Sequence, residues 1–440
     1  MDGVSFINQC PILPGLSFTY EFTVHTPGTN FYHAHIGSQR TQGLFGPLII
    51  VKKKSENNLE KYREYVMVLN DWNHDFDSNT AHLKSKGFFE PDGATFSPLE
   101  SYDSSKYSKF KWHSGLINGK GRYYDPSTGN HNAAPLSRFS VKKGETIRFR
   151  VISAGTMFPL RFSVDRHLLT MISSDGYRFE NVSVESFILS PGERFDFLLT
   201  ADETVGRYWI FAETTEVKNV ASQTRPTPRH RAEAILEYEE AGPMSDTNYD
   251  NWVKNPLNKN PHCLLSRCYV LNCPFDVSFV DNYNLKCLHL TDLTATESQT
   301  LEKENDFEER FYNFAFFGGG SINGRHWEYP PVSAASQKDE LQDVDTTCKE
   351  CTKDKACSCT HIETLESDKY YQFVLINDGD GSGYAHPIHL HGHNFQVVKQ
   401  GFSDDIYQSP DIKCLGGGGT ICNEAEWKDP NMSGRKFGIS

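Results

Sequence analysis

Short runs of β-branched and aromatic residues, bounded by Gly, Pro, Asn and Asp, recur along the whole chain, whereas apolar residues at helical spacing are scarce. Short apolar runs separated by turn signals are typical of antiparallel sandwiches and barrels. At 142–145 and 190–193 a turn signal directly precedes such a run. The pattern therefore predicts an all-β protein, with strands at residues 18–24, 48–51, 65–69, 146–152, 187–189, 195–199, 207–212, 371–376 and 395–398.

Two polar stretches are typical of linkers. Residues 52–64 are charged and poor in apolar side chains, and residues 239–261 are rich in Asn, Asp, Pro and Lys. They divide the chain into predicted domains at 1–55, 60–240 and 262–440. The first piece is too short to form a sandwich by itself, so we expect it to be the second half of a domain.

Length and charge narrow the function classes. The chain has 440 residues, 23% of them charged, and a formal net charge of −13. This is a globular composition. The negative balance, without a long basic stripe, disfavours binding to a phosphate backbone, so we expect no nucleic-acid partner. No apolar run approaches the length that would span a bilayer.

Cysteine usage points to an oxidising compartment. Eight of the 11 cysteines form two groups of four, and two N-x-S/T sequons, at 181–183 and 431–433, fit a secreted protein. The first residues show no signal peptide. We therefore expect an extracellular protein whose N-terminal end is missing. The second cysteine group, at 348–359, could also bind zinc, although disulfides fit this composition better.

Histidine spacing gives the most specific chemical signal. Residues 386–393 hold four imidazoles in eight positions, and a further pair, His33 and His35, lies far upstream. Side chains at i and i+2 of a strand point to the same side, so His33 with His35, and His389 with His391, could each grip one metal centre. His386 has the opposite parity and is free to serve another centre. Imidazole is a common ligand for copper and zinc.

The surroundings of these histidines resemble the multicopper oxidase family. Residues 28–50, which contain His33-Ala34-His35, resemble the second copper motif of that family, and residues 386–395 resemble its third. Five flanking segments are similar to the animal laccase-like branch, at 1–4, 9–12, 69–74, 116–121 and 192–196.

The resemblance implies tandem cupredoxin-like Greek-key β-sandwich domains, the first and third incomplete, with type 1, type 2 and type 3 copper centres. Type 1 copper would take electrons from the substrate, and the other centres would reduce dioxygen to water. Carried over by motif position, His386 would bind type 1 copper and His389 type 2 copper. His33, His35 and His391 would bind the type 3 pair.

The chain also departs from the family pattern. It contains no His-Trp-His-Gly run like the first copper motif and no His-Cys-His run like the fourth. We therefore expect a fragment that, expressed alone, binds copper weakly and shows no oxidase turnover. His393 corresponds to a position that the family does not use as a ligand, so we expect it to be structural.

Three functions follow as hypotheses. The first is a laccase-type enzyme that oxidises phenols or diphenols and reduces dioxygen to water. The second is a ferroxidase that takes Fe(II) as its reductant. The third is a non-catalytic copper-binding cupredoxin protein, in which the loss of two motifs is genuine. The sequence does not choose between the two reductants, because overall acidity does not identify an iron-binding residue.

Overall fold

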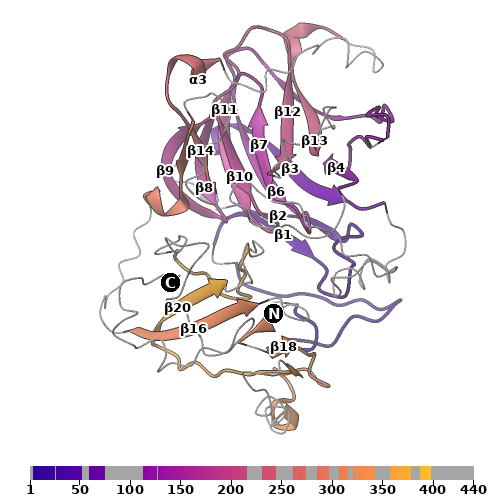
Figure 1. Cartoon of the computed structure of the whole chain (residues 1–440), viewed down its shortest axis with the longest axis vertical. Helices are drawn as coiled ribbons and strands as arrows, with labels where there is room; N and C mark the ends of the chain where they lie inside the picture. The colour runs from indigo at the N-terminus through magenta and orange to yellow at the C-terminus, as the bar shows by residue number, and fades with distance from the viewer. Residues whose placement is uncertain are drawn as a thin grey trace.

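Strands dominate the structure, a computed structural model, which confirms the all-β fold class. Figure 1 shows a central unit of two packed sheets, a hairpin (β1 and β2) beneath it, and a five-stranded sheet beyond the hairpin. The residues that the structure describes are 3–24, 26–51, 59–74, 112–125, 127–215, 230–243, 261–273, 285–296, 307–315, 321–323, 325–341, 357–377 and 387–397.

The central unit packs a six-stranded sheet against a seven-stranded sheet (Figure 1). The first has the order β4 (Ser114–Ile117), β3 (Arg63–Trp72), β6 (Thr146–Ser153), β11 (Arg194–Thr200), β8 (Leu169–Ser174) and β9 (Tyr177–Val184). The second has the order β15 (Leu285–Leu288), β14 (Cys268–Leu271), β10 (Ser186–Leu189), β7 (Leu160–Val164), β12 (Arg207–Thr214), β13 (Arg231–Tyr238) and β5 (Ser137–Val141).

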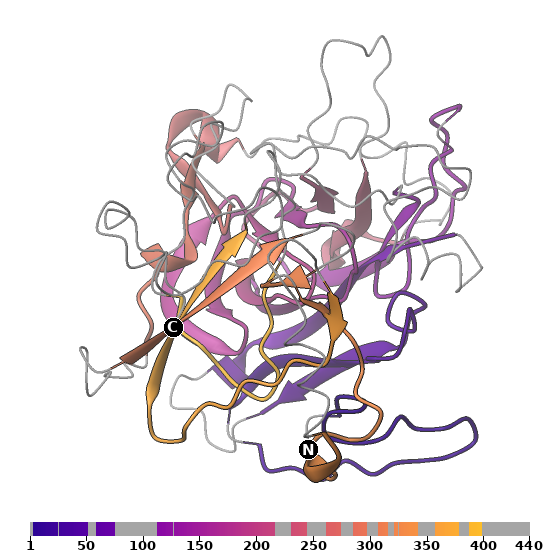
Figure 2. The ribbon, with the colours of Figure 1, turned by 60° about the horizontal axis from the view of Figure 1, so that its bottom comes forward.

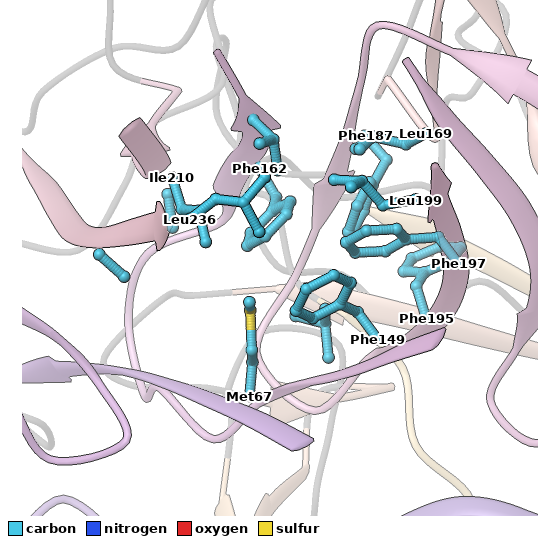
Figure 3. Packing of buried hydrophobic residues seen from close by; sticks show 14 of the residues in the cluster. Met67, Phe149, Phe162, Leu169, Phe187, Phe195, Phe197, Leu199, Ile210 and Leu236 are labelled. Atoms are coloured by element: carbon cyan, nitrogen blue, oxygen red, sulfur yellow. The ribbon is translucent and has the colours of Figure 1, made fainter. Parts of the chain in front are cut away.

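Alternating side chains from both sheets form the core of the central unit. In β5 and β7 every second residue is buried, as expected when one face of a strand lies against another layer. Phe149 stacks on Phe197 at 5.1 Å between ring centroids, and Phe197 meets Phe162 of the opposite sheet at 5.6 Å (Figure 3). Burial of side chains of this size stabilises the fold by about 1.5–3 kcal/mol each.

Strands β14 and β15 extend the seven-stranded sheet beyond β10. Buried Val270 of β14 and Cys287 of β15 pack with Ile188 of β10. Disulfides join Cys263 to Cys268, next to the short helix α3 (His262–Leu265), and Cys273 to Cys287. These strands fall within the predicted third domain (262–440), and β14 pairs with β10 of the central unit. The domain boundaries stay a prediction.

The N-terminal segment, residues 3–51, contains little sheet. Its strands β1 (Gly28–His33) and β2 (Phe45–Ile50) pair in antiparallel fashion. The strand predicted at 18–24 is wrong, because this stretch forms no ladder with any described residue. Figure 2 shows the indigo end of the chain as an open loop at the periphery. Close to its start, the Ala334 and Ala335 N–H groups donate to the Phe6 and Ile7 carbonyls.

The C-terminal part forms the five-stranded sheet. Residues 395–397 belong to no strand, so the prediction there is also wrong. The order is β19 (Cys357–Cys359), β18 (Arg325–Trp327), β17 (Ser321–Ile322), β16 (Phe307–Ala315) and β20 (Tyr370–Asn377), with β16 and β20 parallel.

The helices that the structure describes are short. Besides α3 they are 3-10 turns, none of them long and apolar enough within the described residues to cross a membrane. Cys359 of the second cysteine group is disulfide-bonded, which agrees with a disulfide rather than a zinc ligand at that position. The 3-10 turns are η1 (Leu59–Lys61), η2 (Glu239–Ala241), η3 (Leu290–Asp292) and η4 (Lys338–Leu341).

Candidate metal centre

The upstream histidine pair sits at the end of strand β1. His33 is the last residue of the strand and faces Phe45 of β2 in the register, while His35 lies two positions further on. The two imidazole rings are 4.5 Å apart between centroids. Phe31, two residues before His33, stacks on its ring at 4.9 Å. The alternation of an extended chain thus places Phe31, His33 and His35 on one side.

The downstream pair meets the upstream pair in space. His389 and His391 lie 4.6 Å apart between ring centroids, and His391 lies 4.5 Å from His35. Four rings therefore form a continuous chain in the order His33, His35, His391, His389. The structure brings together two segments from opposite ends of the sequence, as a shared centre requires.

The 386–393 cluster contains two further histidines. His386, the predicted type 1 ligand, lies outside the described residues. His393 is described and exposed, and its predicted structural role stays a prediction.

The environment keeps the upstream imidazoles neutral. Burial lowers the pKa of His35 to about 4, with further lowering by the neighbouring His33, His391, His389 and Arg40. Burial also lowers the pKa of His33, partly offset by its Nδ1 contact with the Ala34 carbonyl oxygen at 3.1 Å. A metal binds the neutral ring, so the cost of removing a proton before binding is small here.

Arg40 fastens the histidine segment to the central unit. Its Nη2 donates to the Gly155 carbonyl at 2.6 Å, and its Nε donates to the Ala154 carbonyl at 3.3 Å. The loop that accepts these bonds is itself held, because Asp71 accepts the N–H of Thr156 at 2.7 Å. Burial raises the pKa of Asp71, and bonds from backbone N–H groups oppose that shift.

Thr29 of β1 provides a second link between the histidine segment and the central unit. This residue is 1% exposed. Its hydroxyl donates to Asp196 at 2.6 Å and accepts a bond from Arg150 Nη1 at 3.0 Å. Asp196 is also 1% exposed and pairs with Arg148 at 2.5 Å. Arg194 Nε adds a bond to the Thr29 carbonyl at 3.1 Å. Burying the Asp196 carboxylate is costly unless it is paired and hydrogen-bonded. Thr29 of β1 therefore helps to stabilise the buried ion pairs of the central unit.

Sequence reasoning missed both links. Thr29 and Arg40 lie in the segment that resembles the second copper motif, but neither is a metal ligand by residue type, and Thr29 lies 167 positions from Asp196. Residues 192–196 did stand out as a family-like segment, but nothing in their chemistry indicates a partner in β1.

The donor set can be tested against copper. All four described candidates are imidazoles, they come from two segments, and two of them are held neutral, which suits both Cu(I) and Cu(II). In the described parts of the chain no group of three or more His, Cys, Asp or Glu side chains could hold a metal ion by itself. The residues therefore fit copper by donor type and proximity, as part of a coordination shell.

Comparison with known proteins supports the same chemistry. Three family models, each described as multicopper oxidase, match residues 1–55, 63–241 and 329–415. Laccase-4 of Thanatephorus cucumeris is 30% identical over 431 residues, with 96% of this chain and 70% of that protein covered. A laccase of Trametes maxima is 30% identical over 404 residues, with 90% and 66% covered.

Solved structures show the same fold. The crystal structure of Fet3p, a multicopper oxidase that functions in iron import, matches with a TM-score of 0.62 at 20% identity, over 96% of this chain and 69% of Fet3p. A laccase from Botrytis aclada matches with a TM-score of 0.55 at 21% identity, over 91% of this chain and 63% of that laccase. The cupredoxin-like expectation for the fold is thus confirmed.

Proposed function

Because the chain belongs to the multicopper oxidase family, we propose that it works as a laccase-type copper oxidoreductase, which oxidises phenols or diphenols and reduces dioxygen to water. The observation that carries this proposal is the meeting of His33 and His35 with His389 and His391 in one chain of imidazole rings. The laccases named above agree with it.

We assign the ligands by motif position. His33, His35 and His391 would hold the type 3 copper pair, His389 the type 2 copper and His386 the type 1 copper. Bound copper would supply the one-electron steps and the binding of dioxygen. The chain itself contributes neutral imidazoles, the burial that keeps His33 and His35 unprotonated, and the Arg40 and Thr29 links that fix the segment.

The ferroxidase alternative remains a separate proposal about the reductant. Fet3p supports the fold alone at 20% identity, so its role in iron import is not carried over to this chain. The non-catalytic cupredoxin alternative requires that copper binds without turnover.

One set of measurements separates the three functions. Copper retained after dialysis is measured for the parent chain, for His35→Ala, for His391→Ala and for the double variant. Oxygen uptake with a diphenol and with Fe(II) is measured for a version of the chain that also carries the first and fourth copper motifs. We expect each variant to lose copper, and the double variant to lose little more, because both residues serve one centre. Unchanged copper retention in both variants would show that these histidines do not bind copper. Uptake with the diphenol supports the laccase, uptake with Fe(II) alone supports the ferroxidase, and bound copper with neither supports the non-catalytic protein.

Branch and compartment are finer proposals. We place the chain in the animal laccase-like branch on its five flanking segments, although the relatives named above are fungal. A tree that groups those segments with fungal laccases would overturn the placement. We also propose secretion, supported by the disulfides Cys263–Cys268 and Cys273–Cys287, since such bonds persist in oxidising compartments. Detection of the intact protein in the medium of expressing cells tests it.

A further inference from the structure

Asn181 lies in a sequon, Asn181-Val182-Ser183, that the copper chemistry does not use. The structure places it in β9, and both Asn181 and Ser183 are exposed, whereas Val184 is buried. Within the described part of the chain, neither polar side chain takes part in a hydrogen bond or ion pair. The amide and the hydroxyl two residues later therefore lie on the solvent side of the sheet, next to each other.

The strand that carries Asn181 is an edge strand with an irregular register. β9 is the last strand of the six-stranded sheet, at the opposite side from β4 (Figure 1). In the register, Val182 pairs with Met171 of β8, and Arg178 pairs with Ser173. Three residues of β9, 179–181, therefore lie opposite one residue of β8 and form a bulge. Bulges at sheet edges turn side chains outward and end the pairing.

Only part of the outer edge of β9 is covered. The Glu180 N–H donates to the Thr294 carbonyl at 2.8 Å, and the Thr296 N–H donates to the Arg178 carbonyl at 3.1 Å. Among the described residues no such bond continues along Asn181 to Ser183. An open stretch of edge strand is a template for pairing with another chain, which native proteins block by charge, bulges or a cover.

We propose that Asn181 is the attachment site of an N-linked oligosaccharide that covers this open edge. In the transfer, the Asn181 Nδ2 forms a bond to the anomeric carbon of a lipid-diphosphate-linked oligosaccharide. The bond from that carbon to the diphosphate oxygen breaks, the lipid diphosphate leaves, and the amide loses one proton to the transferring enzyme. The hydroxyl of Ser183 is what the sequon requires at the third position.

Peptide analysis tests the attachment. The full chain, directed into the secretory pathway of a eukaryotic host, is digested before and after treatment with peptide-N-glycosidase, which leaves aspartate at a glycosylated asparagine. We expect conversion at position 181 in the parent and in Ser183→Thr, which keeps the hydroxyl, and none in Ser183→Ala. Unmodified Asn181 in molecules whose Cys263–Cys268 disulfide has formed would overturn the proposal. That disulfide reports passage through the oxidising compartment independently of copper and of turnover.

Aggregation tests the covering role. Light scattering on mild heating is compared for the glycosylated parent, Asn181→Gln and Ser183→Thr at equal concentration. We expect several-fold faster aggregation for Asn181→Gln, while Ser183→Thr follows the parent. Equal rates for all three would show that the oligosaccharide does not protect the edge.

Discussion

The central unit and the N-terminal segment present similar apolar side chains in opposite environments. In the central unit Phe149, Phe162 and Phe197 are fully buried between two sheets. In the N-terminal segment Phe22 is 52% exposed and Leu16 is 65% exposed. Apolar residues at alternate positions specify a side that can be buried, but burial needs a facing layer. The fold and the candidate metal centre therefore depend on different regions.

His33 and His35 belong to the N-terminal segment, and hydrogen bonds join this segment to the central unit. The Thr29 and Arg40 links both end on residues of the central unit. Hydrogen bonds of this kind contribute less per residue than a core aromatic side chain but fix direction more tightly. We therefore expect that stability and copper binding can be damaged separately.

The largest expected effect is on the core. Phe197→Ala removes a ring that contacts both sheets, and should lower the free energy of unfolding by about 3–5 kcal/mol. Urea denaturation followed by tryptophan fluorescence measures the change. Phe197→Leu is the control and should cost clearly less, because it leaves a smaller cavity. A loss of unfolding free energy below about 1 kcal/mol for the alanine variant, which is the usual effect of any substitution, would contradict the tight packing of Phe197 between the two sheets.

The next effect concerns the Thr29 link. Thr29→Val keeps the shape but removes the hydroxyl between Asp196 and Arg150, and should cost about 1–3 kcal/mol because a buried charged pair loses a bond. Copper retention should fall as well, since β1 carries His33 at its end. Thr29→Ser restores the hydroxyl and should restore both quantities. If Thr29→Val loses stability but retains copper like the parent, the link supports only the fold.

Arg40 should show a smaller effect on stability and a visible one on copper. Arg40→Lys keeps the positive charge but lacks the fork that reaches the Ala154 and Gly155 carbonyls, and should cost about 0.5–1.5 kcal/mol. Copper retention should fall in Arg40→Lys and in Arg40→Met alike, because position rather than charge is lost. A variant pair in which only Arg40→Met loses copper would assign the effect to charge instead.

The sequence alone predicted the structure correctly where turn residues are followed by a strand that packs in the core. The turn signals at 142–145 and 190–193 are confirmed, with Gly144 and Gly192 at φ 80° and 98° and with hydrogen bonds closing both turns. These are values that glycine adopts at no steric cost. The strands that follow these turns are β6 and β11, both in the core.

The sequence alone did not predict features that depend on a contact with a distant part of the chain. Residues 18–24 show strand-like composition, yet no described residue pairs with them, and composition alone does not reveal a missing neighbour. Thr29 and Asp196 are ordinary polar residues in the sequence, and only the fold makes them a pair. The histidine parity argument is local, which is why ring contacts agree with it, although the ligand roles stay a prediction.

The smallest expected effect gives the sharpest test of the comparison. Phe22→Ala deletes the same atoms as Phe197→Ala, but from a side chain that is 52% exposed and has no facing layer among the described residues. It should change the free energy of unfolding by no more than about 0.5 kcal/mol, as is usual for surface positions. Self-association should weaken, since exposed apolar side chains promote contacts between molecules. Urea denaturation and light scattering measure the two quantities. If Phe22→Ala costs as much as Phe197→Ala, residues 16–24 pack against a partner in solution, and the difference between the two regions disappears.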